Sequence, residues 1–289
     1  MKSAVSQLPL EGSVSQRTIV ITGASDGIGA ATARRLAARG ERLLLHGRSA
    51  TKLAAVAEPL GAESFVADFE RLSDVRDLGQ QLLERVHRID VLANNAGGIF
   101  GKRKVTVDGN ERTMQVNYYA HFLLTHLLFE VLRESRAKIV STSSIGAWAF
   151  GRIDLTDLDN KRKYRATKAY GDSKLANILF TKALHAHYHG EGISAVALHP
   201  GNIASNFGND GATWLRFIYR SPLRHLLSTP NTGAKNLLWA IDGTPDVTWR
   251  SGEYYESRRI PRRVNHQQND AALVVAFWKE SARRVGIDA

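Results

Sequence analysis

Short apolar runs alternate along the chain with longer segments in which apolar residues recur at helical spacing. The short runs are rich in valine, isoleucine and leucine and do not alternate strictly with polar residues, which is typical of strands covered on both faces. We expect strands over residues 18–22, 42–46, 64–67, 89–93, 138–142 and 193–198. We expect helices over residues 27–39, 50–58, 74–86, 108–132, 166–188 and 232–241.

This regular alternation of strand and helix predicts the fold class. It favours a parallel, doubly wound sheet with right-handed crossovers and helices on both faces, a Rossmann-type three-layer α/β/α fold. No segment rich in proline, glycine and serine divides the chain, so we expect one domain over residues 17–289. The polar, aperiodic residues 1–16 are expected to form a flexible N-terminal arm. A less regular stretch at about 202–229 is expected to form a flap that faces the substrate.

Length and composition exclude several classes of protein. The 289 residues are 43% hydrophobic and 23% charged, an ordinary globular composition. No apolar run reaches the ~18 residues that a membrane-spanning helix needs, and residues 1–10 lack the apolar core of a secretion signal. Because there are no cysteines, disulfides and thiolate metal sites are excluded, and we expect no metal site. The expectation is a soluble, cytoplasmic protein without a membrane span.

The formal net charge of +11 raises the question of an anionic partner. Much of the excess lies in three clusters, at 161–168, 216–224 and 258–263. One interpretation is a surface for nucleic acid or an anionic membrane, and the other is solvated loops whose field attracts an anionic dinucleotide. No basic helix interleaved with aromatic residues and no nucleic-acid motif accompanies the charge. We therefore favour the second interpretation and expect no nucleic-acid partner.

A glycine-rich segment follows the first expected strand and leads directly into the first expected helix. Residues 22–29 read Thr-Gly-Ala-Ser-Asp-Gly-Ile-Gly, a Gly-x-x-x-Gly-x-Gly spacing. Without Cβ atoms the chain can turn tightly and admit a pyrophosphate, while the helix presents unpaired N–H groups and the positive end of its dipole. A tight structural turn is the alternative, but the position between strand and helix favours a nucleotide site.

The end of the second expected strand bears on which dinucleotide binds. NAD-preferring folds usually carry an acidic residue there, which binds the ribose 2′-hydroxyl. Residues 46–49 read His-Gly-Arg-Ser instead, and Arg48 can pair with a 2′-phosphate through charge-assisted contacts. We therefore expect NADP(H), with NAD(H) and an ordinary exposed arginine as the alternative. Asp68, after the third strand, is expected either beside the adenine ring or as a cap of the next helix.

Two Tyr-x-x-x-Lys spacings occur, Tyr164 with Lys168 and Tyr170 with Lys174. Residues four apart share a helix face, so either lysine can stabilise a neighbouring phenolate and lower the pKa of its tyrosine from the ordinary value near ~10. Such a tyrosine can exchange a proton near neutral pH. The second pair leads into a helix of apolar period, whereas the first lies in a basic cluster at or before the helix start. We therefore favour Tyr170.

Hydroxyl side chains end the fifth expected strand, where residues 141–144 read Ser-Thr-Ser-Ser. Parallel sheets bind their ligands at the carboxyl ends of the strands. A hydroxyl there can donate a hydrogen bond to a developing alkoxide, and a serine that only caps a turn is the alternative.

In order and approximate spacing, these motifs resemble the short-chain dehydrogenase/reductase superfamily over residues 17–287. The resemblance rests on residues 22–29, Asn94-Asn95-Ala96-Gly97, Asn117, Ser144, Tyr170 with Lys174, and Pro200-Gly201. Within the superfamily the chain resembles the retinol dehydrogenase and WW-domain oxidoreductase branch at residues 106–125, 169–177, 251–255 and 277–281. The 26 positions from Ser144 to Tyr170 match the longer loop of that branch and again favour Tyr170 over Tyr164.

The resemblance implies that Tyr170 exchanges the proton of the carbonyl or alcohol oxygen, and that Lys174 lowers the pKa of Tyr170 and holds the nicotinamide ribose. Ser144 would polarise the substrate oxygen, with Ser143 as the alternative. Asn117 would distort its helix and hold a water that links Lys174 to solvent. The residues implied to bind the dinucleotide are Gly23, Ser25, Asp26, Gly27, Ile28, Gly29, Arg48, Asp68, Phe69, Asn95, Ala96, Gly97, Tyr170, Lys174, Pro200, Gly201, Ile203 and Ser205.

The chain departs from the pattern of its relatives in two respects. Ser205 stands where many of them carry threonine, and it would contact a phosphate less rigidly. Animal members of the branch often carry a membrane anchor, which is not expected here, so a bacterial-type soluble relative is favoured over an enzyme for retinol itself.

The expected function is that of an NADP(H)-dependent oxidoreductase, a carbonyl reductase that moves a hydride between nicotinamide and a carbonyl or alcohol. A non-redox cyclase or dehydratase that uses Tyr170 as acid/base, and a nucleotide-binding protein without turnover, are the alternatives. Aromatic residues at 207, 214, 217 and 219, with Trp148 and Phe150, indicate either a pocket for a hydrophobic substrate or ordinary packing. Family members commonly pair the helices corresponding to 108–132 and 166–188 across a two-fold axis, which favours a homodimer or homotetramer over a monomer.

Overall fold

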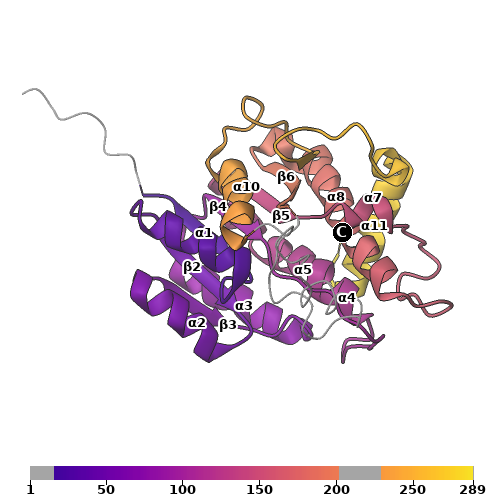
Figure 1. Ribbon diagram of the computed structural model, residues 1–289, viewed down its shortest axis with the longest axis horizontal. Coiled ribbons are helices and arrows are strands. Elements are labelled where there is room, and N and C mark those ends of the chain that lie inside the picture. Colours follow the sequence, from indigo (N-terminus) through magenta and orange to yellow (C-terminus); the bar gives the residue numbers. More distant parts are fainter. Residues whose placement is uncertain (1–15, 202–228, 289) are drawn as a thin grey trace, which may run out of the picture.

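The chain folds around one parallel sheet with helices on both faces, as the computed structural model in Figure 1 shows. The structure describes residues 16–201 and 229–288. The expected N-terminal arm and substrate flap, including Ile203 and Ser205, therefore lie almost entirely outside the described residues.

The sheet has seven parallel strands in the order β3-β2-β1-β4-β5-β6-β7. Their bounds are β1 Thr18–Ile21, β2 Arg42–Gly47, β3 Glu63–Val66, β4 Val91–Asn94, β5 Lys138–Thr142, β6 Ser194–His199 and β7 Glu253–Glu256. The first six confirm the expected strands to within two residues, and the expected Rossmann-type class is confirmed with them. The strand order reverses between β1 and β4, and folds of this kind bind ligands at the carboxyl ends of the strands beside that point.

The seventh strand was not expected. β7 is short and carries a glutamate at each end, so only Tyr254 and Tyr255 are buried between them. Two apolar residues do not form a run that distinguishes a strand from a loop.

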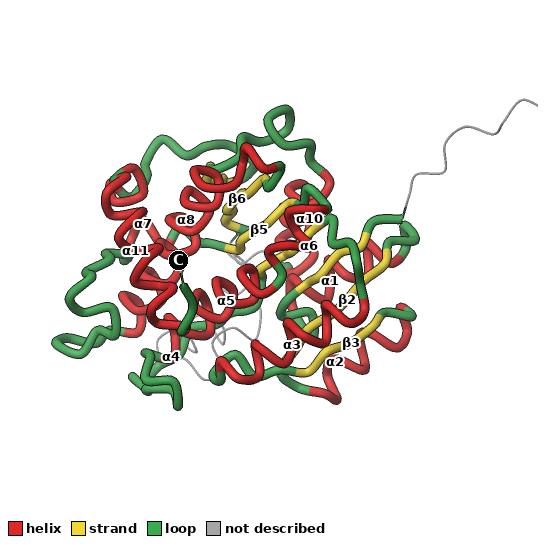
Figure 2. Tube along the Cα trace, turned by 180° about the vertical axis from the view of Figure 1, so that it is seen from behind, coloured by secondary structure: helices red, strands yellow, loops and turns green. Residues whose placement is uncertain are grey.

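The central strands carry consecutive apolar residues because successive side chains enter different layers of the core. Ile19 and Ile21 pack in the layer of α1 and α10, whereas Val20 packs in the opposite layer, with α3, α5 and α8. The principal helices are α1 Gly27–Ala37, α2 Ala50–Ala57, α3 Leu72–Arg85, α5 Ala120–Leu127, α8 Ala166–Tyr188 and α10 Pro230–Asp242. The two layers can be compared in Figures 1 and 2, which view the sheet from opposite sides. In the described part of the chain, no helix is long and apolar enough to span a bilayer.

The prediction of one continuous helix over 108–132 is wrong in two ways. The helical segment begins later, and it is interrupted. Val105 and Glu111 pair in a small antiparallel hairpin, and Gly109 turns it with a φ of 83°. The Asp108 carboxylate accepts the N–H of Leu72 at 3.0 Å and so caps α3 rather than lying in a helix. The helical segments that follow are α4 Arg112–Met114, a π-helical turn Gln115–Tyr119, α5, and α6 Phe129–Glu134.

A C-terminal helix, α11 Ala271–Val285, packs against α8 and α5 and was not expected as a helix. The rings of Phe277 and Tyr118 stack with their centroids 5.1 Å apart, and the Tyr118 hydroxyl lies 2.8 Å from the Ser281 hydroxyl. Trp278 meets Phe122 edge to face at 4.9 Å. α11 therefore covers aromatic residues of α5 and of the turn before it.

Candidate active site

The segment that joins β1 to α1 leaves no space for a side chain at Gly23 or at Gly29. A Cβ on Gly23, whose φ is 69°, would lie 2.7 Å from Ala96 Cα, and a Cβ on Gly29 would lie 2.3 Å from the Gly23 carbonyl oxygen. Asp26 caps α1 by accepting the Gly27 N–H at 2.6 Å. Such a close-packed turn at a helix N-terminus fits a dinucleotide pyrophosphate. Of the other residues expected to bind here, Ser25 lies in the same turn, and Ile28 lies in the first turn of α1.

The segment after β4 forms the other wall of this turn. The Asn95 side chain donates to the Thr22 carbonyl at 3.0 Å and accepts from the Thr142 hydroxyl at 3.3 Å, so it ties together the ends of β1, β4 and β5. A Cβ on Gly97 would lie 2.9 Å from Asn117 Oδ1, so this glycine too is packed against a candidate catalytic residue. The structure thus brings the expected residues 95–97 beside the glycine-rich turn.

Arg48 follows β2 at the same edge of the sheet, and its side chain is 61% exposed. Glu70 lies 4.0 Å from it and also contacts Lys104 at 2.5 Å and Arg112 at 3.7 Å. Three cations therefore surround one carboxylate at the place where a 2′-phosphate is expected. Sequence reasoning missed Glu70, Lys104 and Arg112, because no local pattern shows that the loop before α4 meets the loop after β3.

Asp68 does not cap α3. Its carboxylate accepts the N–H of Glu70 at 3.1 Å, within the loop that follows β3. The capping alternative is therefore excluded, since Asp108 performs that role. The ring of Phe69 is buried and stacks on His46 with the centroids 4.3 Å apart, so a dinucleotide could meet Phe69 only through its backbone.

Tyr170 and Lys174 lie on the same face of α8, with the Lys174 ammonium 5.7 Å from the centre of the Tyr170 ring. Lys174 is 1% exposed, and its Nζ donates to the carbonyl of Thr142, the last residue of β5, at 2.9 Å. Burial lowers the pKa of Lys174 to about 7. The pair therefore lies at the carboxyl end of the sheet, beside the candidate dinucleotide turn.

Of the two candidate serines, Ser144 lies beside Tyr170, and its Oγ also accepts the N–H of Gly146 at 3.1 Å, as the turn-capping alternative expects. An added Cβ on Gly146 would lie 3.0 Å from Tyr170 Cε1 and 3.5 Å from Ser144 Oγ, so the tyrosine and this serine flank the same glycine. Ser143 is buried and donates its hydroxyl proton to the Lys174 carbonyl at 2.7 Å. The geometry thus favours Ser144 over Ser143.

The competing tyrosine–lysine pair has other partners. Tyr164 precedes the start of α8, and its hydroxyl donates to the Phe100 carbonyl at 3.3 Å. Lys168 forms an ion pair with Asp172 at 2.5 Å. Because that carboxylate neutralises the lysine, the pair is unsuited to stabilising a phenolate.

Asn117 lies in the π-helical turn, so the helix is distorted at this residue as expected. Its side-chain amide donates to the Gly98 carbonyl at 2.9 Å and to the Ser173 hydroxyl at 3.0 Å. Its main-chain carbonyl accepts from Asn177 at 3.2 Å and lies 3.1 Å from a ring nitrogen of His121. His121 was not predicted as a site residue.

Large, partly exposed apolar residues follow Ser144 in the chain. Trp148 lies in α7, Gly146–Ala149, and Phe150 follows this short helix. Each of the two side chains is 49% exposed. Pro200 and Gly201 follow β6, and the Pro200 carbonyl accepts from Asn236 at 3.0 Å.

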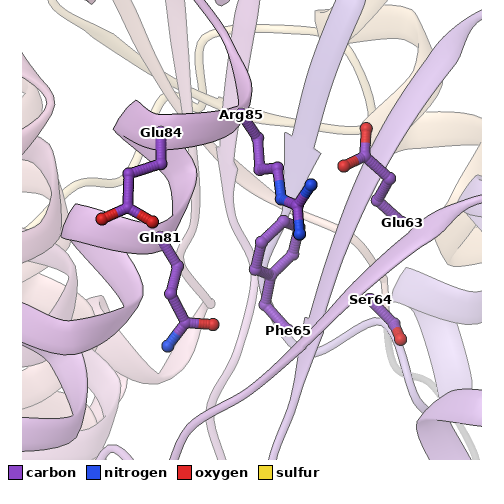
Figure 3. Close-up of a pocket in the computed structure, with 6 residues that line it drawn as sticks. All are labelled: Glu63, Ser64, Phe65, Gln81, Glu84 and Arg85. Atoms are coloured by element: carbon purple, nitrogen blue, oxygen red, sulfur yellow. The ribbon is translucent and has the colours of Figure 1, made fainter.

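A hollow of about 400 Å³ lies away from this site (Figure 3). Glu63 and Arg85 line it, at the first residue of β3 and the last of α3. It therefore lies toward the amino ends of the strands, opposite the candidate catalytic edge.

A tyrosine–lysine pair beside a glycine-rich turn, on a doubly wound sheet, defines a dinucleotide-dependent enzyme site. The chain matches the short chain dehydrogenase family over residues 17–215 and belongs to that family.

Its relatives agree with the branch expected from the sequence. The chain is 39% identical over 284 residues to "Putative daunorubicin C-13 ketoreductase DnrU" of Streptomyces sp. (strain C5), covering 95% of this chain and 94% of that protein. It is 33% identical over 296 residues to human retinol dehydrogenase 13, covering 97% and 88%. The crystal structure of an uncharacterised protein from Mycobacterium paratuberculosis superposes with a TM-score of 0.74 at 31% identity, covering 94% of each chain.

Proposed function

We propose that this protein is an NADPH-dependent carbonyl reductase that acts on a hydrophobic ketone or aldehyde. The observation that carries the proposal is the buried Lys174 ammonium beside the Tyr170 ring, at the strand edge that also holds Ser144 and the glycine-rich turn. The family match supports the use of a nicotinamide dinucleotide. The preference for NADPH over NADH is our own inference.

The chain's own groups supply the proton and the orientation. When bound, the reduced nicotinamide provides a hydride to the carbonyl carbon. The Tyr170 hydroxyl donates its proton to the carbonyl oxygen as negative charge develops there. The Lys174 ammonium stabilises the remaining phenolate, because opposite charges attract strongly in a poorly solvated site. Ser144 donates a hydrogen bond to the same oxygen and fixes the orientation of the carbonyl.

The preference for NADPH is supported by the cations around Glu70. Arg48, Lys104 and Arg112 carry three positive charges against one carboxylate, which leaves a net positive environment for a 2′-phosphate. Competition between NADPH and NADH tests this, and the proposal predicts the lower Kd for NADPH.

The hydrophobic substrate is supported by the apolar surface beside Ser144. Ile145, Trp148 and Phe150 are large apolar residues that remain partly exposed next to a polar site, which is typical of a binding surface. The Streptomyces relative is named as a ketoreductase, which supports a ketone as the reacting group.

The experiment follows the absorbance of the reduced nicotinamide during incubation with polycyclic aromatic ketones, long-chain aldehydes and small hydrophilic sugars. We expect NADPH oxidation with the first two classes. Tyr170→Phe should remove most turnover and leave the Kd of NADPH nearly unchanged, while Tyr164→Phe serves as the matched control with turnover retained. Consumption of substrate without a change in absorbance would indicate the non-redox alternative instead.

The assembly and location of the protein are also proposals. α11 occupies the side of α5 and α8 on which Phe277 and Trp278 pack, so these helices are partly covered within one chain. We infer that a homodimer or homotetramer through this face is disfavoured and propose a monomer, which light scattering coupled to gel filtration tests. The expected cytoplasmic location stays a prediction, for which cell fractionation is the measurement.

A further inference from the structure

His121, on the first turn of α5, contacts both halves of the candidate site. The side chain is 1% exposed. Its Nε2 lies 3.0 Å from the Thr22 hydroxyl, and its Nδ1 lies 3.1 Å from the Asn117 carbonyl oxygen. One buried ring therefore joins the residue that opens the dinucleotide turn to the residue in the π-helical turn.

On one side, the Thr22 hydroxyl determines where the segment after β4 lies. Its oxygen accepts the N–H of Asn95 at 2.8 Å and that of Ala96 at 3.0 Å. Ala96 in turn packs against Gly23 so closely that an added Cβ would overlap it. The direction of one hydroxyl thus affects the shape of the dinucleotide turn.

On the other side, the Asn117 carbonyl is connected to Lys174. Asn177 donates to this carbonyl at 3.2 Å, and the Asn117 side chain donates to Ser173, the residue before Lys174. A displacement of Asn117 would therefore move the groups that hold the catalytic lysine in place.

The hydrogen-bond partners determine the tautomer of His121. The Asn117 carbonyl can only accept, so Nδ1 must carry the proton. The Thr22 oxygen already accepts two N–H groups, and its own proton has two acceptors within reach, the unprotonated Nε2 at 3.0 Å and the Ala93 carbonyl oxygen at 3.2 Å. Nε2 is the nearer of the two, so His121 draws the hydroxyl proton away from the Ala93 carbonyl. Burial lowers the pKa of His121 to about 3, which keeps the ring neutral at neutral pH.

We propose that His121 is a positioning residue that couples the dinucleotide turn to Asn117 and Lys174. The neutral ring orients the Thr22 hydroxyl with one nitrogen and fixes the Asn117 carbonyl with the other. This inference rests on the proposed reductase activity and extends it to a residue behind the reacting groups.

Three substitutions separate the two contacts. His121→Phe keeps an aromatic ring and removes both hydrogen bonds. His121→Asn places an amide near the Nδ1 position and can restore the contact with Asn117, whereas His121→Gln reaches the Nε2 position and can restore the contact with Thr22. Thr125→Val is the matched control, because Thr125 is a buried residue one turn further along α5 and its hydroxyl accepts from Asn94 at 3.2 Å.

The measurements are kcat, the Kd of NADPH and the melting temperature. We expect His121→Phe to lower kcat roughly ten- to a hundred-fold, because small misplacements of reacting groups cost about that much. We also expect it to raise the Kd of NADPH several-fold, and we expect Thr125→Val to lower the melting temperature without either effect. His121→Asn should recover mainly kcat and His121→Gln mainly the Kd.

The proposal is overturned if kcat and Kd in His121→Phe match those of Thr125→Val. It is also overturned if neither His121→Asn nor His121→Gln recovers either quantity. Nitrogen-15 NMR of labelled histidine gives a test that needs no turnover: His121 should keep the Nδ1–H tautomer from about pH 6 to about pH 8. If Tyr170→Phe retains full turnover, the proposed reductase chemistry fails, while the Kd and the NMR signal still decide the role of His121.

Discussion

Replacing Lys174 should make the protein more stable at neutral pH. Its Nζ is fully buried and donates to the Thr142 carbonyl, and burial lowers its pKa from 10.5 to about 7. The unfolded chain keeps the ordinary pKa, so between about pH 7 and pH 10.5 the unfolded state binds more protons than the folded state. The free energy of unfolding therefore rises with pH across this window.

The pKa values set the size of the effect. One pH unit corresponds to ~1.4 kcal/mol, so the difference between 10.5 and about 7 gives an upper limit of roughly 5 kcal/mol. The full cost is present below about pH 7, where the folded protein must hold a buried ammonium. It disappears as the pH approaches 10.5, where the lysine is neutral in both states.

The assay compares Lys174→Met with its parent in a Tyr170→Phe background, so that the neighbouring phenol does not titrate. Methionine has a similar length and no charge, and denaturant titrations at a series of pH values give the free energy of unfolding. We expect the methionine variant to be more stable by a few kcal/mol near pH 7, with the gap closing toward pH 10. A gap that is the same at every pH would refute the reasoning, because the ammonium would then not be destabilised by burial.

Three further predictions concern the dinucleotide turn, the cation cluster and the C-terminal helix. Gly29→Ala should abolish NADPH binding measured by fluorescence, since its Cβ would lie 2.3 Å from the Gly23 carbonyl oxygen; unchanged affinity would contradict the assigned turn. Arg48→Gln combined with Lys104→Gln should raise the Kd of NADPH roughly ten-fold and leave that of NADH unchanged, because charge-assisted contacts are lost; an equal loss for both would refute the 2′-phosphate site. Phe277→Ala should lower the free energy of unfolding by about 3–5 kcal/mol in denaturant titrations, because it empties a fully buried position; a loss below about 1 kcal/mol would show that α11 is not part of the core.

Most of the sheet was predictable because its strands are buried on both faces. Ile19, Val20 and Ile21 enter different layers, so the strand appears as a continuous apolar run that sequence alone can identify. β7 lacks such a run. α11 did have detectable signals, namely Asp270 as its N-cap and Gly286 in a left-handed conformation after its end.

The candidate site was predictable where its residues share one helix or one turn. The choice of Tyr170 over Tyr164 followed from the apolar period of the helix, and the geometry of the two pairs agrees with it. Glu70 and Lys104 could not be paired in advance, since they come from separate loops that only the tertiary fold brings together. His121 could not be recognised as a site residue for another reason. The residues around it in the sequence form an apolar helix, and they do not indicate which polar group its ring contacts.

Each of the two Tyr-x-x-x-Lys spacings contains a lysine. The surroundings of that lysine in the fold determine whether its positive charge can stabilise a phenolate. In the described part of the chain, Lys168 has a carboxylate partner, Asp172, whereas Lys174 has only the Thr142 carbonyl within hydrogen-bonding distance. A carboxylate beside Lys174 would stabilise its ammonium and would also cancel the field that the Tyr170 phenolate needs. A carbonyl dipole orients the ammonium without neutralising it, so the charge remains available to the phenolate. The instability expected of a buried ammonium and its capacity to stabilise a phenolate therefore have the same cause, namely a positive charge held without a counterion.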